Sequence, residues 1–220
     1  MLAILSACSS GSSPRAAATS GRGTTTSSPA LINPTPTSRG AAPTPPSTAA
    51  GCSSGSRGAR SGGTDASPPG DIPDSQAFVS FAPAPARYTV DVPEGWARTD
   101  ASNHVHFNQK LIDIDIALET SALAPTQATA QAESRSLARS NPCFKLAEIT
   151  TVTRRSGPAL RIAYQVDSAP AAVTGKLVRD DVERYELWHA GTKAVITLSA
   201  PAGSDNVDVW RRITDSFAWK

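Results

Sequence analysis

The side chains best suited to chemistry are two imidazoles and two carboxylates at alternating positions of two neighbouring segments. They are His104, His106, Asp113 and Asp115. If two strands pair Phe107 with Ile112, each histidine lies opposite an aspartate at about 5 Å across the strands. The opposed pairs are then His106 with Asp113 and His104 with Asp115. Nitrogen and carboxylate ligands at this spacing hold zinc or another divalent metal. We favour the alternative, an exposed polar face with weak cross-strand pairs, because nothing else in the sequence marks a metal centre or a catalytic base.

A second acidic cluster lies further along the chain: Asp180, Asp181, Glu183 and Glu186. It lacks the Asp/Asn ladder and central glycine of a calcium loop, and Arg179 and Arg184 interrupt it. We interpret it as the solvated face of a strand. Residues 78–220 contain neither the Gly-x-Ser-x-Gly motif of serine hydrolases nor a glycine-rich phosphate loop. We therefore predict no catalytic residue and no cofactor, and we expect a protein that is not an enzyme.

Three tryptophans, Trp96, Trp188 and Trp210, are candidate walls of an apolar pocket between a sheet and its helices. Such a pocket would make the protein a carrier of a small apolar ligand. The simpler interpretation is that these rings form the core, because large aromatic side chains supply much of the buried surface of a small domain.

Patterns of apolar residues predict the elements that must position these side chains. We expect strands over residues 87–92, 104–107, 111–119, 144–154, 159–167, 182–189 and 193–200. A tight turn around Gln109 and Lys110 joins the second of these strands to the third. Helices are expected over residues 125–140 and 206–217. Hairpins throughout predict an α+β fold, an antiparallel sheet with packed helices.

The C-terminal helix is predicted to bury one apolar stripe. Ser204 or Asp205 is expected to cap its start. The stripe has spacings of three and four residues and consists of Val207, Trp210, Ile213 and Phe217. This spacing predicts that the helix packs on the sheet.

Composition divides the chain near residue 78. All 12 aromatic residues follow residue 77, whereas 10 of the 18 prolines and 10 of the 15 glycines precede residue 78. We expect residues 9–77 to be a disordered tether, because they bury too little apolar surface to offset the entropy of ordering, and residues 78–220 to be one folded domain. The domain carries 16 basic and 16 acidic residues. Because this balance comes without a clustered basic face, we predict no nucleic-acid partner.

Residues 1–8, MLAILSAC, end in Leu5-Ser6-Ala7-Cys8 and precede an abrupt change to Ser, Gly, Pro and Thr. This junction resembles the signal of bacterial lipoproteins. The resemblance implies that Cys8 is lipidated and anchors the protein on the extracytoplasmic face of the cell membrane. Only seven residues precede Cys8, and none is basic. Because a secretory signal needs a basic start and a longer apolar segment, we expect the natural start to lie upstream of Met1.

Cys52 and Cys143 remain once Cys8 is lipidated. A disulfide between them would tie the arm to the domain. We favour a free, buried thiol at Cys143, because a cysteine in the Gly/Ser tract around residue 52 has no packing partner.

Three segments of the domain resemble a known family. They are Tyr88–Trp96 (YTVDVPEGW), the hairpin around Gly157 and the ending from Ala200 to Trp219. They are similar to actinobacterial lipoproteins with a Mog1/PsbP-like α/β/α sandwich, a group that includes LpqN-type proteins. The resemblance covers residues 78–220 and implies a non-enzymatic, surface-anchored binding or interaction module. Its partners would be the membrane and a protein or cell-wall component. A ligand carrier and a metal-binding hairpin remain as alternatives.

Overall fold

The computed structural model describes residues 51–53, 70–85, 87–170 and 175–220. The predicted lipidation residue Cys8, the segment 1–8 and most of the tether 9–77 lie outside the described residues. The chain divides into the units Met1–Ser47 and Thr48–Lys220, and every described residue belongs to the second. In this described part, no helix has both the length and the apolar character needed to span a membrane.

Ten strands and two helices form within the described residues. The strands are β1 (Phe78–Phe81), β2 (Tyr88–Pro93), β3 (Ala97–Ala101), β4 (His104–Gln109), β5 (Ile112–Thr120), β6 (Lys145–Arg154), β7 (Gly157–Asp167), β8 (Arg179–His189), β9 (Thr192–Pro201) and β10 (Ala218–Trp219). The helices are α1 (Gln127–Ser140) and α2 (Val207–Ser216). Every strand and helix predicted from the apolar pattern is present. The pattern missed β1, which has only four residues, β3, whose five residues are all exposed, and β10, which has only two residues.

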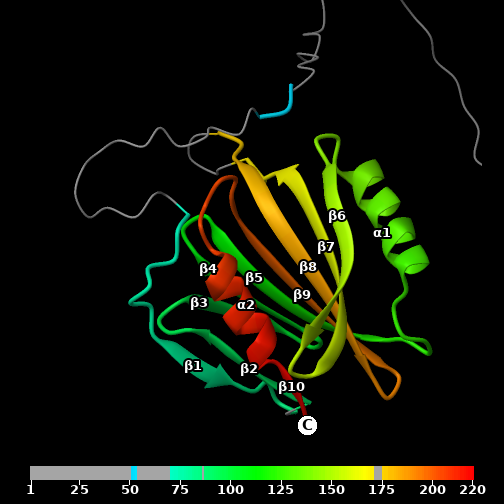
Figure 1. Cartoon of the computed structure of the whole chain (residues 1–220). Helices are drawn as coiled ribbons and strands as arrows, with labels where there is room; N and C mark the ends of the chain where they lie inside the picture. The colour runs from blue at the N-terminus through cyan, green and yellow to red at the C-terminus, as the bar shows by residue number, and fades with distance from the viewer. Residues whose placement is uncertain (1–50, 54–69, 86, 171–174) are drawn as a thin grey trace, which may run out of the picture. The chain divides into compact units, whose positions relative to one another are not determined.

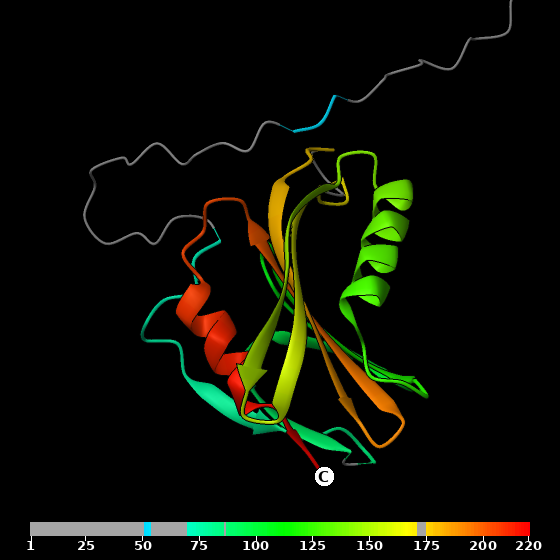
Figure 2. The same ribbon diagram turned by 45° about the vertical axis from the view of Figure 1, so that its right-hand side comes forward.

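The strands form two antiparallel sheets (Figures 1 and 2). One has the order β1-β2-β10, and the other has the order β3-β4-β5-β9-β8-β7-β6. Helix α1 packs on β6 and β7 at one face of the large sheet, whereas α2 packs on β2 and against the opposite face. The predicted fold class, an antiparallel sheet with packed helices, is confirmed.

The main core lies between the two sheets and α2. Alternation along β2 buries Tyr88, Val90 and Val92, as predicted, and these residues pack in one cluster with Ile213 and Phe217 of the α2 region. A second, smaller cluster lies beneath α1 and consists of Ala130, Leu160, Ile162, Tyr164 and Val182. The large sheet is therefore covered by apolar contacts on both faces, with the main core on the α2 side.

Helix α2 differs from the prediction at its start. Its N-cap is Asn206, not Ser204 or Asp205, and Val207 is 69% exposed instead of buried. The Asn206 side chain makes no capping hydrogen bond, because its amide oxygen accepts from the Ile72 backbone N–H at 2.8 Å. Tertiary contacts with an earlier segment have replaced the local cap.

Those contacts also move the start of the folded body. Ile72 is 4% exposed and belongs to the main core, and the carbonyl of Gly70 accepts a 2.7 Å hydrogen bond from the Asn206 side chain. The folded body therefore includes residues 70–77, which the composition had assigned to the tether. Ile72 and several hydrogen bonds to distant residues hold this segment, among them those of Gly70 and Ile72 with Asn206 and that of Asp71 with the Asp205 N–H. Composition does not register such contacts.

The β4–β5 hairpin has a different register from the predicted one. Phe107 pairs with Ile114, and Gln109 pairs with Ile112, so the turn consists of Lys110 and Leu111 alone. Lys110 adopts a φ of 57°, which the tight two-residue turn requires. The predicted pairing was wrong by two residues. Such a shift leaves every side chain on its original face, which is why alternation could not detect it.

Cys52 and Cys143 form a disulfide, so the expectation of a free thiol at Cys143 is wrong. Polar contacts beside the disulfide explain why the Gly/Ser tract meets the domain there. The Ser53 backbone N–H donates to Asp167 at 2.9 Å, and Asp167 pairs with Arg179 at 3.1 Å. These hydrogen bonds supply the partners that the sequence did not reveal.

Candidate ligand-binding cavity

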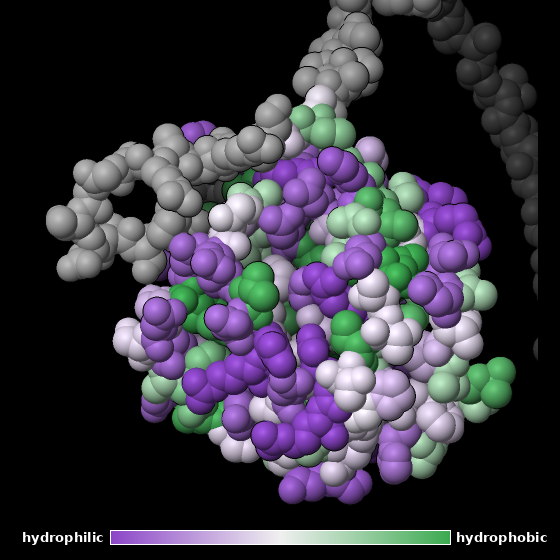
Figure 3. Space-filling view, viewed as in Figure 1, coloured by the Kyte–Doolittle hydropathy of each residue, from purple (hydrophilic) through white to green (hydrophobic). Residues whose placement is uncertain are grey.

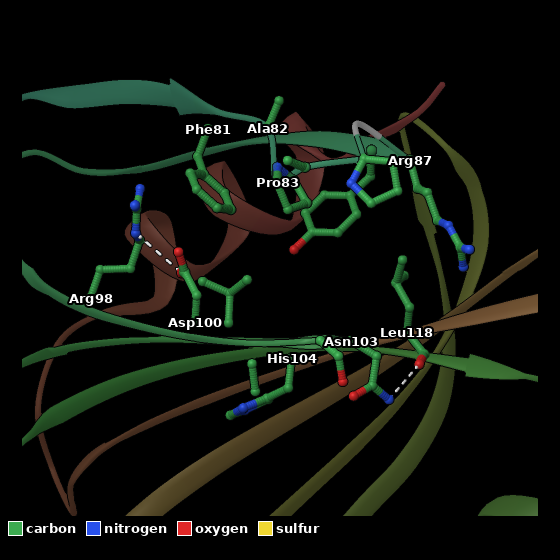
Figure 4. Close-up of a pocket in the computed structure, with 15 residues that line it drawn as sticks. Phe81, Ala82, Pro83, Arg87, Arg98, Asp100, Asn103, His104 and Leu118 are labelled. Atoms are coloured by element: carbon green, nitrogen blue, oxygen red, sulfur yellow. Dashed lines mark hydrogen bonds and ion pairs between the residues drawn. The ribbon is translucent and has the colours of Figure 1, made fainter.

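A cavity of about 480 Å³ opens between the β1–β2 loop and the β3–β4 hairpin (Figure 4). In Figure 4, Phe81, Ala82 and Pro83 lie on one side of it, and Asn103 and Leu118 lie on the other. The volume lies within the range of about 300–1,000 Å³ that is typical of small-molecule pockets.

The wall of the cavity is partly apolar. Its apolar side chains include Phe81, Pro83, Pro85, Val105 and Leu118. The two prolines belong to an Ala-Pro-Ala-Pro run in which the Ala84–Pro85 peptide is cis, and proline rings leave such a loop few backbone conformations. The Phe81 ring packs edge-on against Phe107 with 5.1 Å between ring centroids, so the wall is continuous with the main core.

Two arginines flank the cavity at opposite ends (Figure 4). At one end, Arg98 Nε lies 3.2 Å from Asp100 Oδ1, and its guanidinium lies over the Phe81 ring at 5.3 Å from the centroid. At the other end, Arg87 extends from the β1–β2 loop. Asp100 balances the charge of Arg98, which leaves Arg87 as the cation available at the rim.

Tyr88 contributes a hydroxyl to this wall although the residue is only 2% exposed. Burial, and then the negative charge of Asp100, raise the pKa of Tyr88 to about 12. The phenol therefore stays protonated at physiological pH and acts as a hydrogen-bond donor.

The predicted metal cluster assembles on the other face of the large sheet. His104 Nε2 and His106 Nδ1 lie 2.7 and 3.0 Å from the same oxygen, Asp115 Oδ1. His106 Nε2 also lies 3.3 Å from Asp113 Oδ1. His104 borders the cavity, but in Figure 4 its ring points away from Phe81 and from the space between the walls. All four predicted residues are therefore neighbours, and they form no part of the cavity's interior.

The contacts in this cluster are hydrogen bonds between imidazoles and carboxylates of neighbouring strands. A metal site needs at least three ligand atoms of His, Cys, Asp or Glu close to one another. Among the described residues, Cys52, Cys143 and Asp167 form such a group, with all ligand atoms within 4.8 Å of one another. Its two sulfurs are joined in the disulfide and are not available to a metal. The four hairpin side chains do not form such a group among the described residues.

The three candidate tryptophans do not meet in one pocket, and none of them lines the 480 Å³ cavity. Trp210 lines a separate hollow of about 310 Å³ beside the start of α2. Trp188 borders a hollow of about 150 Å³ and donates to the Ser121 carbonyl at 2.8 Å. Trp96 is 8% exposed and packs in the main core.

The acidic cluster of β8 is not a solvated face throughout, because Glu186 is only 1% exposed. Lys193 lies 3.4 Å from Glu186, and Arg184 lies 3.6 Å from it. Burial, a hydrogen bond to Glu186 and the charge of Glu186 together outweigh Arg184 and raise the pKa of Glu133 on α1 to about 7. These surroundings favour the protonated form of the Glu133 carboxyl more than water does.

Sequence reasoning missed the residues that build the cavity. They come from the end of β1, the start of β2 and the loop between them, from the β3–β4 hairpin and from one position of β5. One local signal was present, the Ala82-Pro83-Ala84-Pro85 run between two strands, which is typical of a stiff loop. Nothing in the sequence indicates what lies opposite this run.

No family model matches the chain, and no curated protein matches it. Several solved structures are similar in backbone. The Ran-binding protein Mog1p of Saccharomyces cerevisiae matches with a TM-score of 0.49 and 11% identity, over 66% of this chain and 96% of that one. The cyanobacterial PsbP protein of Synechocystis sp. PCC 6803 matches with a TM-score of 0.47 and 12% identity, over 69% of this chain and 98% of that one.

LpqN of Mycobacterium tuberculosis, described as involved in cell envelope biogenesis, matches with a TM-score of 0.39 and 17% identity, over 66% of this chain and 85% of that one. The structural neighbours thus include the Mog1, PsbP and LpqN proteins that the sequence resembles. At these identities the similarity concerns the fold, and no neighbour's activity is carried over to this chain.

Proposed function

We propose that this chain is a non-enzymatic binding protein of the cell envelope, anchored by a lipid at Cys8, that holds a small ligand in the cavity beneath the β1–β2 loop. The observation that carries the proposal is the cavity itself, whose lining combines apolar side chains with several polar and charged ones. Its volume is that of a small-molecule site, and its mixed lining suits an amphipathic ligand.

The disulfide supports the proposed extracytoplasmic location. Cys52 and Cys143 are bonded to each other, and disulfides persist in oxidising, extracytoplasmic environments. Together with the lipoprotein-like junction at Cys8, this favours an exported protein held on the outer face of a cell membrane.

The cavity favours a small ligand over a flat docking surface for a protein or wall component. Figure 3 shows hydrophilic side chains spread over the visible face, with hydrophobic side chains in separate small groups. A broad apolar patch, which marks many protein interfaces, is not seen on that face. We place ligand carriage first and a macromolecular partner second, because the cavity has the volume of a small-molecule site.

Native mass spectrometry of the full-length protein, extracted from its own membrane, tests the proposal. We expect wild-type protein to retain a small molecule. Leu118→Trp, which places an indole in the floor of the cavity, should remove that molecule. Leu123→Trp is the matched control, because Leu123 is 79% exposed and does not line the cavity.

A second blocking variant guards against a folding defect in Leu118→Trp. Ser102→Trp fills the rim from an exposed turn and should also lower ligand retention. Far-UV circular dichroism and the melting temperature confirm that each variant is folded. Wild-type protein without a bound molecule, or equal retention by both blocking variants and the wild type, would overturn the proposal.

A further inference from the structure

The Tyr88 hydroxyl is a buried donor without a partner among the described residues. The side chain lines the cavity and is 2% exposed, yet none of the hydrogen bonds formed by described residues involves its oxygen. The hydroxyl is not a sealed, unpartnered atom, since it is absent from the described buried polar atoms that lack a partner. Because Tyr88 lines the cavity and no described residue accepts from its hydroxyl, an acceptor on a bound ligand would give this donor a partner there.

Arg87 is a cation without a side-chain partner in the described part of the chain. Its backbone is fixed, since its N–H donates to the Pro85 carbonyl at 2.8 Å and its carbonyl accepts from Lys220 N–H at 3.0 Å. Arg98, at the opposite end of the cavity, is already paired with Asp100. The two arginines therefore differ, and only Arg87 presents an unbalanced charge to a ligand.

The negative charge of Asp100 decides which kind of acceptor suits each position. Asp100 and Tyr88 line the same cavity, and the negative charge of Asp100 contributes to the raised pKa of Tyr88. An anion beside Tyr88 would be repelled by the same charge, whereas a neutral oxygen would not. A neutral acceptor thus fits the interior, and an oxyanion fits the rim at Arg87.

We infer that the cavity takes a small amphipathic acid whose apolar body carries a neutral oxygen acceptor. The Tyr88 hydroxyl donates a hydrogen bond to this oxygen. A carboxylate or phosphate at the other end of the ligand pairs with Arg87. Phe81, Pro83 and Leu118 contact the apolar body. The inference rests on the proposed ligand-binding function and adds the chemical class of the ligand.

Three probes of nearly identical shape separate the two contacts. In 4-butoxybenzoate an ether oxygen and a carboxylate are both present, 4-pentylbenzoate replaces the ether oxygen by a methylene, and 4-butoxybenzamide replaces the carboxylate by a neutral amide. Isothermal titration calorimetry measures binding to the full chain that carries Cys8→Ser. This substitution removes the lipidation residue, so no detergent is needed. The chain is exported during expression so that the disulfide forms.

We expect 4-butoxybenzoate to bind most tightly. Loss of the ether should weaken binding about fivefold, as expected for one neutral hydrogen bond. Loss of the carboxylate charge should weaken it about threefold, because the ion pair at the rim is exposed to solvent and screened.

Two variants assign these differences to residues. Tyr88→Phe should abolish the difference between the ether and methylene probes and keep the difference between acid and amide. Arg87→Gln should do the reverse. The matched controls are Tyr164→Phe, a buried tyrosine beneath α1, and Arg135→Gln, an exposed arginine on α1, and both should bind like the parent chain.

Equal affinities for the ether and methylene probes would overturn the interior contact, and equal affinities for the acid and the amide would overturn the rim contact. Absence of binding by all three probes at millimolar concentration would overturn the inference as a whole. The proposed function fails by a different result, a native mass spectrum of the membrane-extracted protein that shows no bound molecule.

Discussion

Replacement of Glu133 by glutamine should change how the stability of this protein depends on pH. Glu133 lies on α1, its side chain is 26% exposed, and it pairs closely with Arg184. Burial and Glu186 raise its pKa from 4.5 to about 7. Glutamine has almost the same shape and can still donate a hydrogen bond to Glu186, but it cannot ionise.

The sign follows from the direction of the shift. Between pH 4.5 and pH 7 the folded chain keeps a proton on Glu133 that the unfolded chain has released. The free energy of unfolding therefore falls as the pH rises through this window. At about 1.4 kcal/mol per pKa unit the full effect is about 3 kcal/mol, and screening of the exposed part lowers it to about 2 kcal/mol.

Urea unfolding of the disulfide-intact protein at pH 4 and pH 8, followed by circular dichroism, measures this effect. The free energy of unfolding of Glu133→Gln minus that of the wild type should rise by about 2 kcal/mol from pH 4 to pH 8. The difference between the proteins isolates Glu133 from Asp180, whose pKa burial and Asp113 raise to about 6 and which acts in the same direction.

Glu94→Gln is the matched control, because Glu94 is exposed and far from α1 in the sequence. Its difference from the wild type should stay constant with pH. If the wild-type and Glu133→Gln curves run parallel between pH 4 and pH 8, the pKa of Glu133 is not raised in the folded protein and the reasoning is refuted.

Three further predictions concern the fold. Reduction of the Cys52–Cys143 disulfide, or its removal in Cys52→Ser, should lower the free energy of unfolding by about 2–4 kcal/mol, because the bond joins positions 91 residues apart; an unchanged melting temperature in reductant would contradict this. Ile213→Ala should lower the free energy of unfolding by about 2–5 kcal/mol, because Ile213 is fully buried. Val207→Ala in the same helix should change it by less than about 0.5 kcal/mol, because Val207 is 69% exposed. Equal losses in urea unfolding would show that Val207 is buried, as the apolar spacing predicted. Asn206→Ala should lower the free energy of unfolding by about 2–3 kcal/mol and speed hydrogen exchange at the Ile72 amide. The reason is that the buried Asn206 side chain hydrogen-bonds to both Gly70 and Ile72. Unchanged exchange at Ile72 would show that residues 70–72 are held by other contacts.

The sequence determined most of the secondary structure because each element depends on a local period. Alternating Tyr88, Val90 and Val92 predicted a strand with one buried face, and the structure buries these three residues. The same reasoning predicted hairpins throughout and the α+β class. It failed at β3, where all five residues are exposed and no alternation exists.

The candidate site could not be found in this way. Phe81, Tyr88, Arg98 and Leu118 lie on different strands, and no spacing along the chain relates them. Sequence reasoning selected His104, His106, Asp113 and Asp115 because they are close in the chain, and the structure places them together on the opposite face of the sheet from the cavity's apolar side chains. Local proximity is readable from a sequence, but a cavity is made by segments that meet only after folding.

By itself, the sequence determined most of the elements and most of the faces they bury, the neutral charge of the domain and the lipoprotein-like junction at Cys8. These features depend on residue types and on periods of two or of three to four, which operate within one segment. Only the tertiary structure decided the hairpin register, the partner of Cys143, the burial of Glu186 and the position of the cavity. Each of these depends on which distant segment lies opposite, and that choice is made by the packing of the whole core.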